Sequence, residues 1–186
     1  AALARGESYF THIPAERIRA VQGPRFAVTT DYGAARSADA LILCVPTPLT
    51  QHREPDLSYV TATLEALLPQ LRPGQALCLE STTYPGTTEE LLLPRLQAQG
   101  FTVGEDFFLI YSPEREDPNN ETYSTSTIPK VVGGINADSL AAARALYGAV
   151  ICETVPVSSC RAAEATKLME NIFRSVNIAL VNELKV

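Results

Sequence analysis

Short apolar, β-rich runs alternate with helical stretches along most of this chain, and this alternation constrains the fold more than any other feature. We expect strands in six runs: "RFAVTT" (25–30), "DALILCVP" (39–46), "GQALCLEST" (74–82), "DFFLIYS" (106–112), "KVVGG" (130–134) and "VICETVPV" (150–157). The second run is apolar at successive positions, as in a strand that is buried on both faces. Strands that alternate with helices of about a dozen residues predict βαβ units and a parallel sheet.

Helical patterns fill the intervals between these runs. A helix is expected from about Ser58 to Leu71 with Asp56 as its N-cap, and another over "PGTTEELLLPRLQAQG". In the second, Thr87 and Glu90 have the spacing of a capping box, and Gly100 stands at the end. Asn136 precedes the helix "ADSLAAARALYG" as a candidate cap, and "AEATKLMENIFRSVNIALVNEL" predicts one long helix near the C-terminus.

Composition and charge exclude several classes of function. The formal net charge is -6 and no Lys/Arg run occurs, which argues against nucleic acid or an anionic membrane surface as a partner. No apolar stretch approaches the ~18 residues of a membrane span, and the N-terminus lacks the pattern of a signal peptide. The four cysteines form no C-x-x-C pair and only two histidines occur, so we expect no metal site. We interpret the cysteines as reduced thiols of a cytoplasmic protein, Cys44 and Cys78 acting as small hydrophobes within strands.

Three polar segments follow three successive expected strands. They are "CVPTPL" with Thr47, "ESTTYPGTT" with Ser81, Thr82 and Thr83, and "YSPERED" with Glu114, Glu116 and Asp117. In doubly wound sheets, ligands bind beyond the carboxyl ends of the strands. Hydroxyls before a helix N-terminus suit an anionic ligand, and clustered carboxylates can supply a general base. Taken singly, each segment is better explained by helix capping or by solvated acids. The three together are less easily explained in this way and favour a site.

Lys167 and Asn171 lie four residues apart in the long C-terminal helix and therefore share a face. An ammonium and an amide side by side can point at one ligand. The alternative is a solvated stripe on an amphipathic helix.

A dinucleotide-binding fold normally opens with a strand and a G-x-G-x-x-G turn, and this chain has neither. The chain also stops at Val186 within a helical pattern, so both ends are expected to be cut. The predicted fold class is therefore α/β: part of a doubly wound Rossmann-type parallel sheet followed by a long connecting helix.

The segments "CVPTPL", "REPDLSYV", "ESTTYPGTTEE", "SPEREDP", "PKVVGG" and "AEATKLMEN" occur in an order that resembles the nucleotide-sugar 6-dehydrogenases. These enzymes oxidise the C6 alcohol of a UDP-hexose to a carboxylate with two NAD. The resemblance runs from about Arg5 to Lys185, and "SPERED" is more similar to the UDP-N-acetylhexosamine branch than to the UDP-glucose branch.

The resemblance implies roles for individual residues. Lys167 and Asn171 match the pair that stabilises the oxyanions formed during oxidation. Thr82 matches the threonine that orders a water, and Glu114 matches the base for hydrolysis of an acyl intermediate. Contacts to NAD carry over to Val45, Thr47, Pro48, Ser81 and Thr82. Glu114, Arg115, Glu116, Asp117, Lys167 and Asn171 match residues near the UDP-sugar.

The resemblance also implies an organisation. Residues 1–157 match the latter part of an NAD-binding domain, and residues 158–186 the start of a central helix through which family members form homodimers. Two family features are missing: Pro118 stands where the UDP-glucose branch has a second glutamate, and no cysteine has the context of the catalytic nucleophile.

Two rival interpretations remain open. β-Hydroxyacid dehydrogenases also place a lysine and an asparagine at K-x-x-x-N spacing on a helix after the NAD domain, although the "STTYPGTTEE" and "SPERED" segments fit nucleotide-sugar enzymes better. The other rival is a truncated, non-catalytic module that dimerises or binds NAD or a UDP-sugar.

Overall fold

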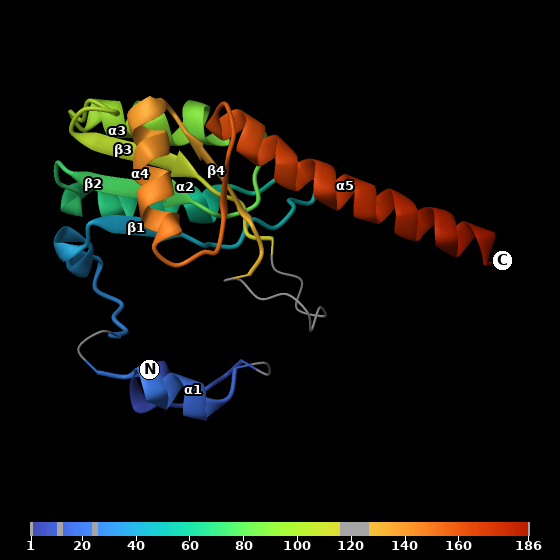
Figure 1. Ribbon diagram of the computed structural model, residues 1–186, viewed down its shortest axis with the longest axis horizontal. Helices are drawn as coiled ribbons and strands as arrows, with labels where there is room; N and C mark the ends of the chain where they lie inside the picture. The colour runs from blue at the N-terminus through green and yellow to red at the C-terminus, as the bar shows by residue number, and fades with distance from the viewer. Residues whose placement is uncertain (1, 11–12, 24–25, 116–126, 186) are drawn as a thin grey trace. The chain divides into compact units, whose positions relative to one another are not determined.

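The computed structural model describes residues 2–10, 13–23, 26–115 and 127–185 (Figure 1). The chain divides into two compact units, Ala1–Ala34 and Ala35–Val186. None of the helices in these described ranges combines the length and the apolar composition needed to cross a membrane.

The first unit contains a short 3₁₀ helix, η1 (Leu3–Arg5), and one α-helix, α1 (Ala15–Val21). The side-chain amide of Gln22 joins them by donating to the carbonyls of Leu3 and Ala4. The strand expected at 25–30 is wrong for its described residues, where only an isolated bridge between Gly23 and Phe26 occurs. An apolar run becomes a strand only when a neighbouring strand satisfies its backbone N–H and C=O groups, and here none pairs with it.

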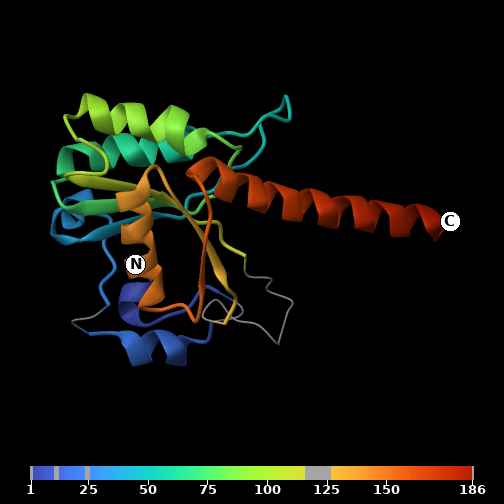
Figure 2. The ribbon, with the colours of Figure 1, turned by 45° about the horizontal axis from the view of Figure 1, so that its top comes forward.

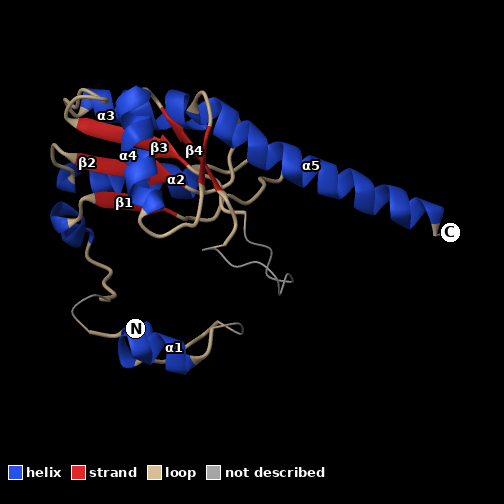
Figure 3. Cartoon of the chain, viewed as in Figure 1, coloured by secondary structure: helices blue, strands red, loops and turns tan. Residues whose placement is uncertain are grey.

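The second unit is built on one five-stranded sheet, which Figure 3 shows in red. In chain order the strands are β1 (Ala40–Leu43), β2 (Gln75–Leu79), β3 (Phe107–Tyr111), β4 (Lys130–Gly134) and β5 (Thr154–Pro156). The spatial order is the same as the chain order. The expected α/β class is thereby confirmed.

The sheet is not wholly parallel, which corrects the sequence-based expectation. β1, β2 and β3 are parallel to one another, but β4 runs antiparallel to β3, and β5 is parallel to β4. A parallel pair needs a long crossover connection, usually a helix. The sequence between β3 and β4 is polar, contains proline and has no helical pattern, so it does not provide that crossover.

Helices cover both faces of this sheet (Figure 2). On one face lie α2 (Ser58–Leu67) with its 3₁₀ extension η3 (Leu68–Gln70), and the π-helical turn η4 (Thr88–Leu92), which continues into α3 (Leu93–Ala98). On the other face lies α4 (Ala137–Gly148), against Cys78, Ile110 and Val132. All five residues of β2 are buried, as expected for a strand covered on both faces.

Several local expectations are confirmed. The side chain of Asn136 accepts a hydrogen bond from the Ser139 N–H and caps α4. Gly100 follows the end of α3 with a φ of 100°, a conformation that favours glycine. The N-cap expected at Asp56 is wrong, because α2 takes Leu57 as its N-cap, although Asp56 accepts a hydrogen bond from the Ser58 N–H. A further 3₁₀ segment, η2 (Tyr32–Ser37), precedes β1.

The long C-terminal helix is α5 (Cys160–Leu184). It begins where Ser159 accepts a hydrogen bond from the Ala162 N–H. Cys160, Ala163 and Glu164 in its first turns are buried. Beyond them the helix runs away from the sheet, as Figure 1 shows in red, and its apolar side chains are exposed.

Candidate functional site at the carboxyl edge of the sheet

The three polar segments picked out in the sequence lie at one edge of the second unit, because β1, β2 and β3 are parallel and end there. The reversed strand β4 begins at the same edge, so Lys130 joins these segments. The site predicted from the sequence is therefore built from three loops and one strand end.

The loop after β1 and the turn after β2 are locked together by their hydroxyl groups. Ser81 Oγ donates to the Val45 carbonyl at 2.7 Å, and Thr47 Oγ1 donates to the Thr82 carbonyl at 2.7 Å. The structure thus brings four of the five predicted cofactor residues into two pairs. Pro48 is tied to the same loop through its carbonyl, which accepts from the Asp56 N–H at 2.8 Å. Because both hydroxyl protons are used internally, these two side chains shape the loops and can only accept from a ligand.

The turn after β2 is capped by a residue that sequence reasoning missed. Glu164 of α5 is fully buried, and its carboxylate accepts from the Gly86 N–H, the Thr88 N–H at 2.9 Å and the Thr88 hydroxyl at 2.7 Å. Burial raises the pKa of Glu164, while these hydrogen bonds act in the opposite direction. The carboxylate fixes the first turns of α5 beside the Ser81–Thr82 turn.

The capping box expected at Thr87 and Glu90 is wrong. Thr87 Oγ1 donates to the Tyr84 carbonyl, and the Glu90 carboxylate pairs with Arg161 at 3.1 Å. Glu164, which caps this turn instead, lies 76 positions from Thr88 in the chain. A pattern of local residue spacing therefore cannot predict it. The available signal is an acidic residue between two alanines, Ala163 and Ala165, in the first turns of a helix, three positions before Lys167.

The segment after β3 is joined to α5. Arg115 Nη2 lies 2.6 Å from Glu170 Oε1, and Arg115 Nη1 donates to the Pro129 carbonyl. The Glu114 carboxylate accepts from the Arg115 N–H and lies 3.3 Å from Lys130 Nζ. Two further predicted substrate residues, Glu116 and Asp117, lie outside the described residues. Pro118 lies outside them as well.

Lys167 and Asn171 lie in the half-buried part of α5, one turn apart as expected. Glu170, which Arg115 binds, lies between them in the sequence and on the same side of the helix. Within the described ranges, neither the Lys167 ammonium nor the Asn171 amide forms a hydrogen bond. Within these residues both polar groups are available to a ligand, whereas the Glu114 carboxylate is bound by Lys130, and Thr82 binds Thr47 through its backbone carbonyl rather than its hydroxyl.

The cysteines are free thiols with different surroundings. Cys78 is fully buried, as expected, but Cys44 is exposed just after β1 rather than packed within a strand. Partial burial and the nearby Glu80 carboxylate raise the pKa of Cys44 to about 11, so its thiol is protonated near neutral pH. In the described part of the chain, no group of three or more His, Cys, Asp or Glu side chains has an arrangement that could hold a metal ion.

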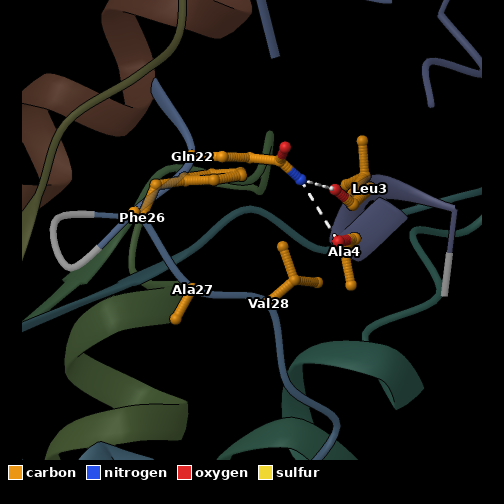
Figure 4. A pocket seen from close by; sticks show the side chains of 7 residues that line it. Leu3, Ala4, Gln22, Phe26, Ala27 and Val28 are labelled. Carbon is orange, nitrogen blue, oxygen red and sulfur yellow. Dashed lines mark hydrogen bonds between the residues drawn. The ribbon is translucent and has the colours of Figure 1, made fainter. Parts of the chain in front are cut away.

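Two cavities differ in their relation to this site. In the first unit a cavity of about 290 Å³ is lined by Leu3, Ala4, Gln22, Gly23, Phe26, Ala27 and Val28, most of them drawn in Figure 4. It contains no residue of the predicted site, and the Gln22 amide is engaged by η1. In the second unit a cavity of about 450 Å³ lies along α5, and its lining is Arg115, Glu170, Phe173, Arg174, Asn177 and Ile178.

Relatives of this chain point to one enzyme family. Protein CapL of Staphylococcus aureus is 40% identical over 153 residues, which are 81% of this chain and 36% of that protein. The UDP-N-acetyl-D-glucosamine 6-dehydrogenase of Pseudomonas aeruginosa is 39% identical, with the same coverage. The crystal structure of the NDP-N-acetyl-D-galactosaminuronic acid dehydrogenase from Methanosarcina mazei Go1 has a TM-score of 0.81 and 32% identity, covering 98% of this chain and 40% of that one.

The chain thus spans well under half the length of these relatives. A family model described as the UDP-glucose/GDP-mannose dehydrogenase family, NAD binding domain, matches residues 2–151. Because this match covers most of the chain, the chain belongs to the UDP-glucose/GDP-mannose dehydrogenase family and matches its NAD-binding domain.

Proposed function

We propose that the intact protein carrying this chain is an NAD-dependent dehydrogenase that oxidises the C6 alcohol of a UDP-N-acetylhexosamine to a carboxylate. The observation that carries the proposal is the convergence of three strand-end segments and the Lys167/Asn171 face of α5 at one edge of the sheet. Relatives named as UDP-N-acetyl-D-glucosamine and UDP-N-acetyl-D-mannosamine dehydrogenases support this substrate class.

The residues present fit one part of a dinucleotide site. Thr82 is exposed at the tip of β2, just before the helix that starts at η4, and the interlocked Val45 and Thr47 loop lies beside it. In this proposal Val45, Thr47, Pro48, Ser81 and Thr82 contact NAD, which supplies the acceptor for hydride. Residues 1–157 belong to the NAD-binding domain, and residues 158–186 begin the helix that leads to the substrate domain.

The proposed chemistry has two oxidation steps. The alcohol loses a proton and a hydride to give an aldehyde, and addition of water with loss of a second hydride gives the carboxylate. Lys167 and Asn171 stabilise the developing oxyanions, since preorganised donors in a closed site are most effective where charge forms. Thr82 orders the water that adds to the aldehyde, and Glu114 accepts a proton from this water. Arg115, with Glu116 and Asp117, approaches the UDP-sugar from the segment after β3.

The test is NADH formation by the intact protein with a panel of UDP-sugars, combined with identification of the product. We expect turnover with a UDP-N-acetylhexosamine, little with UDP-glucose, and a uronate as product. NADH formation with a β-hydroxyacid instead would favour the first rival. Binding of NAD or UDP-sugar without any NADH would favour the non-catalytic module.

We further propose that the protein is a cytoplasmic homodimer in which α5 is covered by a second copy. From Met169 onward, seven apolar side chains of this helix are more than half exposed: Met169, Phe173, Val176, Ile178, Leu180, Val181 and Leu184. An apolar stripe of this kind on a helix favours burial against a partner. Light scattering of the intact protein should give twice the chain mass, and Phe173→Glu together with Val176→Glu should shift it toward the monomer. A wild-type monomer would contradict the dimer.

A further inference from the structure

The reversed direction of β4 determines which residue meets Glu114. The register of β3 and β4 pairs Ile110 with Gly134 and Tyr111 with Gly133. Continued by three residues, the same register sets Glu114 opposite Lys130, and Lys130 Nζ indeed lies 3.3 Å from Glu114 Oε2. A parallel β4 would have started at the other edge of the sheet. The antiparallel strand therefore delivers an ammonium to the carboxyl edge.

The ammonium of Lys130 bridges two of the loops that form the candidate site. It also lies 3.2 Å from Glu80 Oε1, and Glu80 immediately precedes Ser81 and Thr82. The side chains of Lys130 and Glu80 are only 7% and 11% exposed, whereas that of Glu114 is 43% exposed. Buried charges persist only when they are paired and hydrogen-bonded. The inner pair thus anchors the ammonium, and the outer carboxylate keeps a face open to solvent.

Two neighbouring groups donate to the Glu80 carboxylate of the inner pair. The Tyr147 hydroxyl of α4 donates to Glu80 Oε1 at 2.5 Å, and Cys44 Sγ donates to Glu80 Oε2 at 3.6 Å. Cys78 Sγ lies 3.0 Å from the Tyr147 oxygen, and Lys130 Nζ lies 5.2 Å from the centre of the Tyr147 ring. Burial raises the pKa of Tyr147 and of Cys78, so both groups stay protonated at neutral pH.

This arrangement gives the two carboxylates different tasks. Glu80 is surrounded by Lys130, Tyr147 and Cys44, so its oxygens are occupied. Glu114 accepts from the Lys130 ammonium on one oxygen and from the Arg115 N–H on the other, and its side chain is 43% exposed. A carboxylate held in this way is kept ionised and oriented, which are the two requirements for a general base.

We infer that Lys130 is a positioning residue, whose ammonium, anchored by Glu80, holds the Glu114 carboxylate ionised and oriented at the carboxyl edge. The inference rests on the proposed function in one respect, because the role of Glu114 as a general base comes from that proposal. Lys130 itself acts through Glu114 and Glu80.

The test compares Lys130→Met, Lys130→Arg and Glu80→Gln in the intact protein by the pH profile of kcat for NADH formation with a UDP-N-acetylhexosamine. A neighbouring opposite charge shifts a carboxylate titration by about one to three pH units. Lys130→Met should therefore move the acidic limb of the profile upward by about one pH unit and lower kcat about tenfold on that limb, at pH values below both midpoints. KM should change much less than kcat. Lys130→Arg should restore the profile, because the charge is kept.

Glu80→Gln is the matched variant, for which we expect the acidic limb to shift in the opposite direction. Removing this carboxylate leaves the ammonium to Glu114 alone, so the acidic limb should move to lower pH. Carbon-13 NMR titration of the glutamate carboxyls, with Glu114 assigned by Glu114→Gln, follows the same shifts without any turnover. This measurement decides the role of Lys130 even if the wild type forms no NADH, an outcome that would overturn the proposed function alone. The inference would be overturned if the titration of Glu114 stayed unchanged in both Lys130→Met and Glu80→Gln. If Lys130→Met does not fold, an unchanged titration in Glu80→Gln alone would overturn it.

Discussion

At the scale of single residues, neither Lys167 nor Asn171 forms a side-chain hydrogen bond or ion pair within the part of the chain that the structure describes. The helix sets them one turn apart, and the Arg115–Glu170 ion pair brings the segment after β3 to the same stretch of α5. An ammonium in this position is suited to stabilise negative charge that forms only during reaction.

We therefore predict that Lys167→Ala in the intact protein lowers kcat at least ~10²- to 10³-fold, the cost typical of removing one oxyanion donor. The affinity for NAD should be nearly unchanged, because the predicted NAD contacts lie in the loops after β1 and β2. Steady-state kinetics and NAD titration measure the two effects. Lys185→Ala, at the exposed end of α5, is the control. Unchanged turnover in Lys167→Ala would remove this lysine from the site.

Sequence position identified some of these residues and not others, for a physical reason. Ser81 and Thr82 end one expected strand, and Thr47 and Glu114 lie within two residues after two others. A strand end is a local feature. Lys130 is the first residue of the run "KVVGG", and the sequence pattern therefore predicts only that it belongs to a strand. Its place at the site depends on the direction of β4, which the apolar pattern of a strand does not encode.

At the scale of elements, charged side chains fix the start of α5 to the turn after β2 through one buried contact and one exposed contact. The buried Glu164 carboxylate caps the backbone at Gly86 and Thr88, and the exposed Arg161 pairs with Glu89 at 2.9 Å. The buried contact carries most of the stabilisation, because exposed ion pairs contribute little. The helix that bears Lys167 is thus tied to the turn that bears Thr82.

We predict that Glu164→Gln lowers the free energy of unfolding by about 2–3 kcal/mol, since an amide offers one acceptor oxygen where two are needed and sets its NH₂ against a backbone donor. The control is Glu65→Gln, which removes an exposed pair with Arg95 and should cost under ~1 kcal/mol. Urea unfolding compares the two variants with the wild type. Equal midpoints for all three proteins would contradict the cap.

The elements also show where local rules succeed. The Asn136 cap and Gly100 at the end of α3 were predicted correctly, because each acts within a few residues of its own position. The capping box at Thr87 and the strand at 25–30 were wrong, because a buried carboxylate from α5 replaced the first and no strand pairs with the second. Tertiary partners decided both outcomes.

At the scale of the whole molecule, the second unit contains several acids that burial keeps protonated. Burial raises the pKa of Cys160 to about 12 and, together with Glu80, that of Cys44 to about 11. It also raises the pKa of Cys78, Tyr111 and Tyr147. Above the ordinary pKa of these groups the unfolded chain releases protons that the folded chain retains, so stability declines as pH rises.

We predict that the free energy of unfolding falls between about pH 8 and pH 10.5, each such group contributing up to ~1.4 kcal/mol per pH unit. Urea midpoints measured across this range give the slope. Cys160→Ala removes one of the groups and should make the slope shallower. A midpoint that stays constant from neutral pH upward would show that these groups titrate alike in both states.

The most direct test of the account is the number of NADH formed per uronate when the intact protein is given a limiting amount of a UDP-N-acetylhexosamine and excess NAD. Absorbance gives the NADH and chromatography gives the uronate. Oxidation of an alcohol to a carboxylate at one site predicts two NADH for each uronate. One NADH per product with an aldehyde or ketone as the end point, or none at all, would contradict the account.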